Sequence, residues 1–400
     1  MAQIRRTLVL EQRKKKNDFE IHFACSTEGL RKINASALPF KTYPINTISS
    51  TLFYERVNNA NFFYTPKELN NYVIDEKELI KKIDPDLVVS DFRLTASISC
   101  ASTNKPLLNL SNSYWCPNTP CLFPAPAFGI FKILPQKPSD LLFHLVRPVI
   151  FKTFGKELNQ LRIKNGLEKK ADFRELYTDG TYTAYMDMPD FIKTNKLPNN
   201  HFFLGPIILN PEASNQEMEL TDNNYVYISM GSSGDSSLLP TILSSALKFN
   251  LKIILSGIEE KEKIELIKKI PQLKNKCIMK PLIHAENILK NCKLTICHGG
   301  SGTLYQSLAQ GVPVLCFPKN PDQGLASMAI ADNNLGRYIS SKLANQNNIE
   351  VAIFDCLSNE VLKENALQYA KKIKLWNTET HWIQFLNKFK TTRKLNRIIA

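Results

Sequence analysis

The stretch from Cys292 to Asp332 constrains the fold more than any other part of this 400-residue chain. It predicts a buried strand at Leu294–Cys297, a polar turn, a helix at Leu304–Gln310 and a second apolar strand at Val312–Phe317. Apolar strands that alternate with helices favour parallel pairing, because parallel strands need a crossover connection. The chain is therefore expected to be an α/β protein.

The polar turn in this stretch has the sequence HGGSGT and covers residues 298–303. Its three glycines let the backbone approach a ligand closely and point free N–H groups at it. The start of the following helix adds roughly half a positive charge. The expected ligand of this turn is therefore an anion.

The alternation of strands and helices runs along the whole chain and is interrupted once. Residues 209–224 are polar and acidic and show no periodicity, which predicts a linker. Residues 1–208 and 225–375 are then two Rossmann-like domains, and residues 376–400 are a C-terminal helix that packs back on the first domain. Two such sheets place a cleft between the C-terminal ends of their strands, where ligands usually bind.

The amino-acid composition limits the classes of ligand and partner that the protein is expected to bind. A net charge of +14 (51 basic and 37 acidic residues) suits phosphate-bearing ligands or an anionic membrane surface, and the alternative is lysine spread over solvated helices. No basic cluster is interleaved with aromatic residues, so nucleic acid is not expected. The nine cysteines occur singly, mostly in apolar runs and without metal-ligand spacing, which is typical of a reduced cytoplasmic protein without a metal.

One segment, Leu141–Phe154, is both basic and apolar and contains Pro148. It is consistent with ordinary helix packing, or with contact to a membrane surface or an apolar acceptor. No apolar run approaches the length of a membrane span. If the segment contacts a membrane, we expect a peripheral association with the inner face of an anionic membrane.

A second turn rich in glycine and serine, Gly231–Gly234, follows the strand predicted at Tyr225–Met230. Such a turn alone is weak evidence for ligand binding. Two phosphate-binding turns in one sheet, however, can face the same ligand. Neither turn carries a Walker loop, a G-x-G-x-x-G fingerprint or a G-x-S-x-G nucleophile elbow. These absences argue against a P-loop ATPase, a Rossmann dehydrogenase and an α/β-hydrolase.

The motifs CHGGSGT, GVPVLCFP and PDQ, in this order and spacing, resemble the donor-binding region of family-1-type glycosyltransferases that use UDP-sugars. The resemblance extends more weakly to YISMGSSG and DPDLVVSDF. It implies the GT-B fold, with two Rossmann-like βα domains facing across a cleft. It also implies a hexosyltransferase that takes a UDP-sugar or another NDP-sugar as co-substrate and needs no cofactor.

The resemblance assigns roles to particular residues. The H-x-G-x-x-T turn would hold the nucleotide diphosphate, PDQ would bind sugar hydroxyls, and the serine turn would lie near the diphosphate or uridine. The implied donor-binding residues are Ser232, Ser233, Ile283, His298, Gly300, Ser301, Gly302, Thr303, Asp322 and Gln323. Leu282 stands where the family usually has a glutamine near the uracil. The structural alternatives are a capping histidine at His298 and a helix start after Pro321.

The chemistry suits these residue types. When a sugar leaves an NDP donor, negative charge develops on the β-phosphate. Backbone N–H groups, a helix dipole and an imidazole can stabilise that charge without a metal. The resemblance implies base-assisted in-line displacement with inversion.

The start of the chain departs from the family pattern. Family members begin with a strand and a Gly-His turn whose histidine deprotonates the acceptor, whereas this chain begins near the first helix. We therefore expect the N-terminal domain to lack its first, central strand, through a misassigned start or a decayed gene. Asp91, after the strand at Leu87–Ser90, matches the acid that orients the base. It would act alone or through water, or be an ordinary strand-end residue.

Three functions remain open from the sequence. The first is a glycosyltransferase with a small or lipid-like hydroxyl acceptor. The second is a catalytically impaired or silent nucleotide-sugar-binding remnant. The third is another GT-B enzyme such as a UDP-sugar 2-epimerase, which PDQ disfavours.

Overall fold

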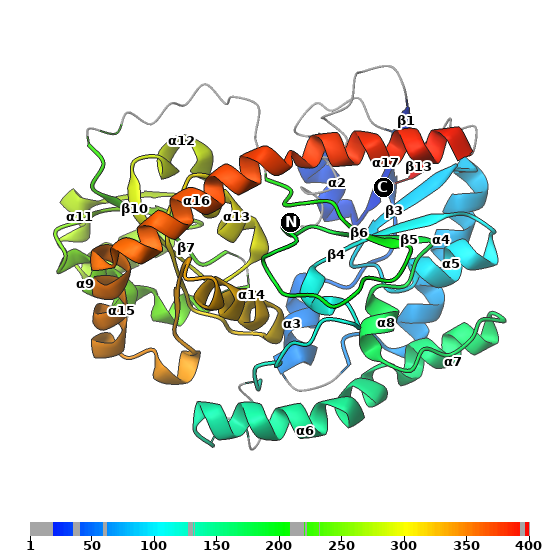
Figure 1. The fold of residues 1–400 in the computed structure, drawn as a ribbon, viewed down its shortest axis with the longest axis horizontal. Helices are drawn as coiled ribbons and strands as arrows, with labels where there is room; N and C mark the ends of the chain where they lie inside the picture. Colours follow the sequence, from blue (N-terminus) through cyan, green and yellow to red (C-terminus); the bar gives the residue numbers. More distant parts are fainter. Residues whose placement is uncertain are drawn as a thin grey trace. The chain divides into compact units, whose positions relative to one another are not determined.

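The computed structural model describes residues 19–34, 41–58, 62–126, 131, 133–208, 220, 222–231, 233–392 and 397–399 (Figure 1). The chain divides into two compact units, of which unit 1 comprises residues 1–120, 145–207 and 377–400, and unit 2 comprises 121–144 and 208–376. Each unit contains one sheet whose strands all pair in parallel. The prediction of an α/β protein with two parallel sheets is confirmed.

The sheet of unit 1 has seven strands in the order β2-β1-β13-β3-β4-β5-β6. Its strands are β1 (Glu20–Cys25), β2 (Lys41–Pro44), β3 (Leu87–Asp91), β4 (Leu107–Ser111), β5 (Tyr182–Tyr185), β6 (His201–Phe203) and β13 (Arg397–Ile399). Strands β3 and β4 are almost entirely buried, as their continuous apolar runs predict for a sheet covered on both faces.

The helices of unit 1 lie between these strands in the chain. They are α2 (Thr27–Asn34), α3 (Ser50–Asn58), α4 (Pro66–Ile83), α5 (Ala96–Ser102), η1 (Ser113–Trp115), α7 (Lys156–Lys164), α8 (Phe173–Tyr177) and α17 (Thr378–Thr392). Helix α4 starts at Pro66, where Thr65 and Glu68 form a reciprocal capping box. Helix α6 (Gln136–Phe154) spans the boundary between the two units.

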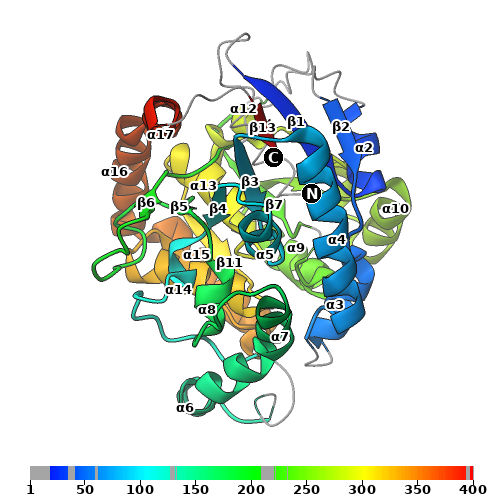
Figure 2. The same ribbon diagram turned by 90° about the vertical axis from the view of Figure 1, so that its right-hand side faces the viewer.

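The centre of the unit 1 sheet, where the sequence predicts a missing strand, is occupied by a strand from elsewhere in the chain. Strand β13, from the C-terminal end of the chain, lies between β1 and β3 (Figure 2). Ile398 is in register with Ile21 on one side and with Leu87 on the other. Backbone groups inside a sheet must find partners, and β13 supplies them to both neighbours. A three-residue strand carries no periodic signal, so the sequence did not predict it.

Helix α17 brings the chain back to unit 1 (Figure 1). Phe385 stacks on Phe202 of β6 at 5.2 Å between ring centroids and meets Tyr182 of β5 edge-on at 5.4 Å. Thr378 donates a hydrogen bond to the Pro206 carbonyl at 2.9 Å, and Trp382 is fully buried. This aromatic contact anchors the helix that precedes β13.

The sheet of unit 2 has six strands in the order β12-β11-β10-β7-β8-β9. They are β7 (Tyr225–Ser229), β8 (Lys252–Ser256), β9 (Cys277–Lys280), β10 (Cys292–Cys297), β11 (Val314–Cys316) and β12 (Gly336–Tyr338). Counted from β9, this is the doubly wound order 3-2-1-4-5-6, and the order reverses between β7 and β10. Ligands of such sheets bind at the carboxyl ends of the strands at this switch point.

Helices and 3₁₀ turns connect the strands of unit 2. They are η3 (Ser236–Leu238), α9 (Leu239–Leu247), α10 (Glu260–Lys269), α11 (Leu273–Lys276), α12 (Ala285–Leu289), α13 (Ser301–Ala309), α14 (Pro321–Asp332), η4 (Ser341–Leu343), α15 (Gln346–Ser358) and α16 (Glu360–Trp376). The predicted linker lies mostly outside the described residues, since only Leu220 and residues 222–224 of it are described.

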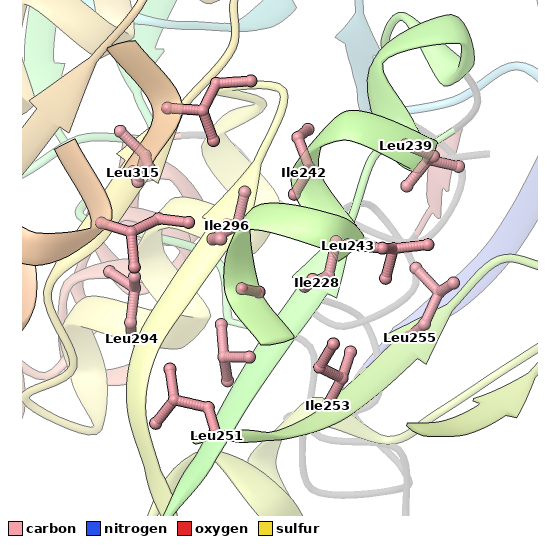
Figure 3. Packing of buried hydrophobic residues seen from close by; sticks show 14 of the residues in the cluster. Ile228, Leu239, Ile242, Leu243, Leu251, Ile253, Leu255, Leu294, Ile296 and Leu315 are labelled. Atoms are coloured by element: carbon pink, nitrogen blue, oxygen red, sulfur yellow. The ribbon is translucent and has the colours of Figure 1, made fainter. Parts of the chain in front are cut away.

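The core of unit 2 lies between α9 and the middle of the sheet (Figure 3). Ile242 and Leu243 of α9 pack with Ile228, Ile253 and Ile296, and all five are fully buried. Burial stabilises each such side chain by about 1.5–3 kcal/mol relative to exposure. This core holds β7 and β10 in place, and with them the loops that follow these strands.

Candidate donor-binding site

The two glycine-containing turns begin side by side in unit 2. Strands β7 and β10 are neighbours, and Ser229 at the end of β7 is in register with Cys297 at the end of β10. The turn 231–234 and the turn 298–300 therefore leave the sheet at the same edge, at the switch point. Ser232 lies outside the described residues.

His298 is enclosed by the glycines of both turns and is only 9% exposed. A Cβ at Gly231, whose φ is +59°, would lie 2.6 Å from Cε1 of His298, and a Cβ at Gly300 would overlap Nε2. A Cβ at Gly234 would lie 2.9 Å from the His298 Cβ. The imidazole therefore occupies space that only glycine leaves free. The sequence pointed to these turns but did not show that Gly231 and Gly234 contact His298.

Helix α13 starts at Ser301, three residues earlier than predicted. Serine, glycine and threonine are typical of turns, but here they occupy the first helical turn, where four N–H groups have no partner within the helix. Gly300 is the N-cap residue and has no side chain that could accept from them. The first turn of α13 therefore lies beside His298 without a side-chain cap, an arrangement that could accommodate an anion.

Gly299 allows α14 to approach this turn. Its φ is +87°, and a Cβ there would lie 2.9 Å from the Gln323 carbonyl oxygen and would overlap the Ser327 hydroxyl. The same hydroxyl donates to the Gln323 carbonyl at 2.7 Å. The first turns of α13 and α14 are consequently held close together.

The PDQ segment forms the start of α14. The Asn320 side chain caps this helix by accepting from the Gln323 N–H at 3.0 Å, so α14 does begin around Pro321. Gln323 is 2% exposed, donates to the Ser233 hydroxyl at 3.0 Å and accepts from the Lys319 N–H at 2.8 Å. The Gln323 side chain therefore joins α14 to the turn after β7. Asp322 is partly exposed in the first turn of α14.

Electrostatics favour a neutral His298 in the absence of ligand. Burial lowers the pKa of His298, and the neighbouring Ser229 backbone and the Asp322 carboxylate oppose that shift. Its Nδ1 atom is buried and has no hydrogen-bond partner among the described residues. A diphosphate beside the ring would supply both a hydrogen-bond acceptor and a charge that favours protonation.

Ile283, unlike the other predicted donor-binding residues, belongs to a hydrophobic cluster of unit 2. Its side chain is 8% exposed and packs in a cluster with Tyr225, Tyr227 and Ile254. Leu282, beside it, is 53% exposed. A nucleotide base at this position would therefore meet the Leu282 side chain and the backbone of Ile283 rather than the Ile283 side chain.

Sequence reasoning did not identify Pro124 as a neighbour of this region. Gly324 follows Gln323 in the chain, and a Cβ at Gly324 would lie 2.5 Å from Cγ of Pro124. The segment 121–144 belongs to unit 2, and Lys342 holds it by hydrogen bonds to the carbonyls of Phe131 and Leu134, the latter at 3.2 Å. An irregular loop of this kind has no periodicity that could reveal the contact.

Asp91 lies in unit 1, at the end of β3, as predicted. Phe92 follows with a φ of +57°, which is uncommon for a bulky residue. Arg93 then pairs with the buried Glu76 of α4 at 2.5 Å, and Glu76 also accepts from Thr95 at 2.5 Å. This network holds the strand end, so the Asp91 carboxylate is attached to a well-fixed backbone.

Two features are absent from the described residues. Within the described ranges, no three His, Cys, Asp or Glu side chains lie close enough together to hold a metal ion. Over the same part of the chain, no helix combines the length and apolar composition needed to cross a membrane.

Comparisons with solved structures identify the class of fold. The chain is similar to the glycotransferase of kitacinnamycin, with a TM-score of 0.68 and 12% identity over 96% of this chain and 94% of that one. It is similar to glycosyltransferase VinC in complex with dTDP, with a TM-score of 0.63 and 14% identity over 98% and 96%. Spinosyn rhamnosyltransferase SpnG complexed with spinosyn aglycone has a TM-score of 0.65 and 15% identity over 96% and 95%. The fold is that of GT-B glycosyltransferases.

Sequence comparisons then identify the family. The erythromycin biosynthesis protein CIII-like C-terminal domain matches residues 241–376. A PGL/p-HBAD biosynthesis glycosyltransferase of Mycobacterium tuberculosis is 29% identical over 375 residues, 93% of this chain and 86% of that protein. A PGL/p-HBAD biosynthesis rhamnosyltransferase of Mycobacterium bovis is 27% identical over 374 residues, 92% and 81% of the two chains.

An inactive PGL/p-HBAD biosynthesis glycosyltransferase of Mycobacterium bovis is 32% identical over 253 residues, which are 62% of this chain and 69% of that protein. The chain belongs to the family-1-type glycosyltransferases, as its motifs predicted.

Proposed function

We propose that the protein transfers a hexose from a UDP-sugar, or another NDP-sugar, to the hydroxyl group of a small or lipid-like acceptor, with inversion and without a metal. The observation that carries this proposal is the enclosure of His298 by Gly231 and Gly300 at the uncapped start of α13. A diphosphate bound there would accept from the N–H groups of the first helical turn and from the imidazole.

In the proposed step, the acceptor oxygen attacks the anomeric carbon as the bond from that carbon to the β-phosphate oxygen breaks. The acceptor proton passes to a base, and the electron pair of the broken bond stays on the NDP. Asp91 is our candidate for the base, directly or through a water. The imidazole and the α13 N–H groups stabilise the leaving diphosphate, a role that typically contributes about 10²–10³ in rate for one such donor.

The comparisons support the proposal in two respects. The solved structure of VinC contains dTDP, and that of SpnG contains an aglycone, so two proteins of this fold bind a nucleotide diphosphate and an acceptor respectively. For this chain we propose a nucleotide-sugar donor in unit 2 and a hydroxyl acceptor. We also propose that the protein contacts an anionic membrane peripherally, which would bring it to a lipid-like acceptor.

The proposal is tested by donor binding and transfer with wild type and His298→Ala. UDP should raise the Tm of the wild type, since a ligand at 100 times its Kd stabilises a protein by about 2.7 kcal/mol. His298→Ala should lose most of this shift and about 10²–10³ in transfer rate, with transfer unchanged by EDTA. His381→Ala in unit 1 is the matched control. If UDP, dTDP and GDP all leave the wild-type Tm unchanged, the proposal fails.

A second candidate is a catalytically silent protein that binds nucleotide sugars. One observation favours it, namely the similarity to a relative described as inactive. This candidate predicts the same Tm shift with UDP but no sugar transfer to any member of a broad hydroxyl acceptor panel. Turnover with any acceptor would rule it out.

A further inference from the structure

Helix α6 exposes an apolar row on its outer side. Leu141, Leu145 and Val149 are 62%, 69% and 70% exposed. Residues spaced by four lie above one another on one face of a helix, so the three side chains form a continuous row. A helix on the surface of a protein ordinarily places polar residues there.

The inner side of α6 is already packed. Phe143 is 4% exposed and meets Phe131 edge-on at 5.5 Å, and Phe151 is 8% exposed and lies 5.8 Å from Phe173. The helix therefore carries two apolar sides, and its ring contacts with other described residues involve only the inner one. Figure 1 shows α6 as one continuous helix that leads into α7.

The charges at the two ends of the apolar row are positive. Lys137 and Lys152 are exposed at its two ends, and His144 is exposed between them. The helix has one acidic residue, Asp140, and its Oδ1 accepts from the Ala125 N–H at 2.7 Å, away from the row. The α6 outer face, defined as Lys137, Leu141, His144, Leu145, Val149 and Lys152, therefore combines apolar and basic groups without a carboxylate.

The start of α6 is held firmly. Ser139 is fully buried and donates to the Phe131 carbonyl at 3.1 Å, and Nζ of Lys342 lies 3.3 Å from the Ser139 hydroxyl. These bonds fix the first turn of the helix on unit 2. The α6 outer face is thus presented on an ordered helix.

We propose that the α6 outer face docks on an anionic lipid bilayer. Aliphatic side chains on one helix face enter the boundary between headgroups and acyl chains, and lysines at the edge pair with lipid phosphates and other anionic headgroups. The net charge of +14 adds a long-range attraction to such a surface. A second copy fits this face poorly, because two-fold pairing would bring Lys137 of one copy near Lys152 of the other.

This inference rests on the peripheral membrane contact proposed above and assigns it to one surface. The test is flotation with vesicles of phosphatidylcholine alone and of phosphatidylcholine with phosphatidylserine. Wild type should float with the anionic vesicles only, and less in high salt. The variant Leu141→Gln/Leu145→Gln/Val149→Gln should bind at least about tenfold more weakly with an unchanged Tm.

The chain offers a matched control on α15, where Val351 and Phe354 are 60% and 61% exposed. The variant Val351→Gln/Phe354→Gln should float like the wild type. If wild type does not float, or if the α6 variant floats as well as the wild type, the inference is overturned. It is also overturned if the α6 variant instead dissociates a dimer seen by size exclusion. Sugar transfer to a water-soluble acceptor is measured separately. Transfer without flotation would contradict the membrane inference alone, and flotation without transfer would contradict the proposed transferase activity alone.

Discussion

The sheets of the two units, of seven and six parallel strands, obtain their central strand in opposite ways. In unit 2 the strand at the switch point is β7, which precedes all other strands of that unit in the chain. In unit 1 the equivalent place, between β1 and β3, is filled by β13 from the C-terminal end. A central parallel strand therefore comes from the start of the unit's own chain segment in unit 2 and from the distant C-terminal end of the chain in unit 1.

The two central strands also differ in how strongly they are held. Strand β7 has five residues, of which four are buried, and it is in register with five residues of β10 and four of β8. Strand β13 has three residues, in register with three of β1 and two of β3. In both sheets the central strand supplies backbone partners to its two neighbours, since a sheet interior tolerates few unpaired N–H and C=O groups.

The largest effect should follow from breaking β13. Ile398→Pro removes an N–H group from the middle of the sheet and restricts the backbone. We expect the substitution to release the whole of β13 from both neighbours, so that several hydrogen bonds are lost at about 0.5–1.5 kcal/mol each and unit 1 loses on the order of 3–5 kcal/mol. Hydrogen exchange should quicken in β1 and β3 and stay unchanged in β7.

Ile398→Val is the control for this variant, because it keeps the backbone N–H group and should preserve slow exchange throughout. Equal exchange in β1 for the proline variant and the wild type would show that β13 does not hold the sheet of unit 1 together.

A smaller effect should follow in unit 2 from Gly231→Ala. The new Cβ would meet the His298 ring, and alanine is strained at a φ of +59°. We expect the Kd for UDP, measured by calorimetry, to rise at least about tenfold, equivalent to 1.4 kcal/mol. Gly166→Ala in unit 1 shares the backbone strain, at a φ of +75°, but meets nothing within 4 Å. It should leave the Kd unchanged, and an equal loss in both variants would refute the role of the His298 contact.

The smallest effect concerns pH. Burial lowers the pKa of His201 in unit 1 to about 4 from a usual value of 6.5, and its Nδ1 lies 2.7 Å from the Tyr185 hydroxyl. Between these pH values the unfolded chain binds more protons than the folded one, so stability falls as the pH drops from about 6.5 to about 4.

His201→Gln should flatten this part of the pH dependence in unit 1 only, as followed by hydrogen exchange at several pH values. Unit 2 should keep its own dependence, because burial also lowers the pKa of His298. His144→Gln, at an exposed site, is the control. An unchanged slope in unit 1 of the His201 variant would contradict the assignment.

The sequence by itself determined those features that depend on neighbours in the chain. The apolar runs at β3 and β10 predicted buried parallel strands, and the glycine-rich turn after β10 predicted an anion site. Such signals are local, because hydrophobic periodicity and turn chemistry act over a few residues.

The tertiary structure alone decided the contacts between distant segments. It inserted β13 into the first sheet, joined Gln323 to Ser233, and enclosed His298 between Gly231 and Gly300. It also decided that the apolar row of α6 faces outward, which periodicity could not show because both sides of that helix are apolar. These outcomes depend on which backbone edges and side-chain surfaces remain free after the local elements have formed, and no short stretch of sequence records that.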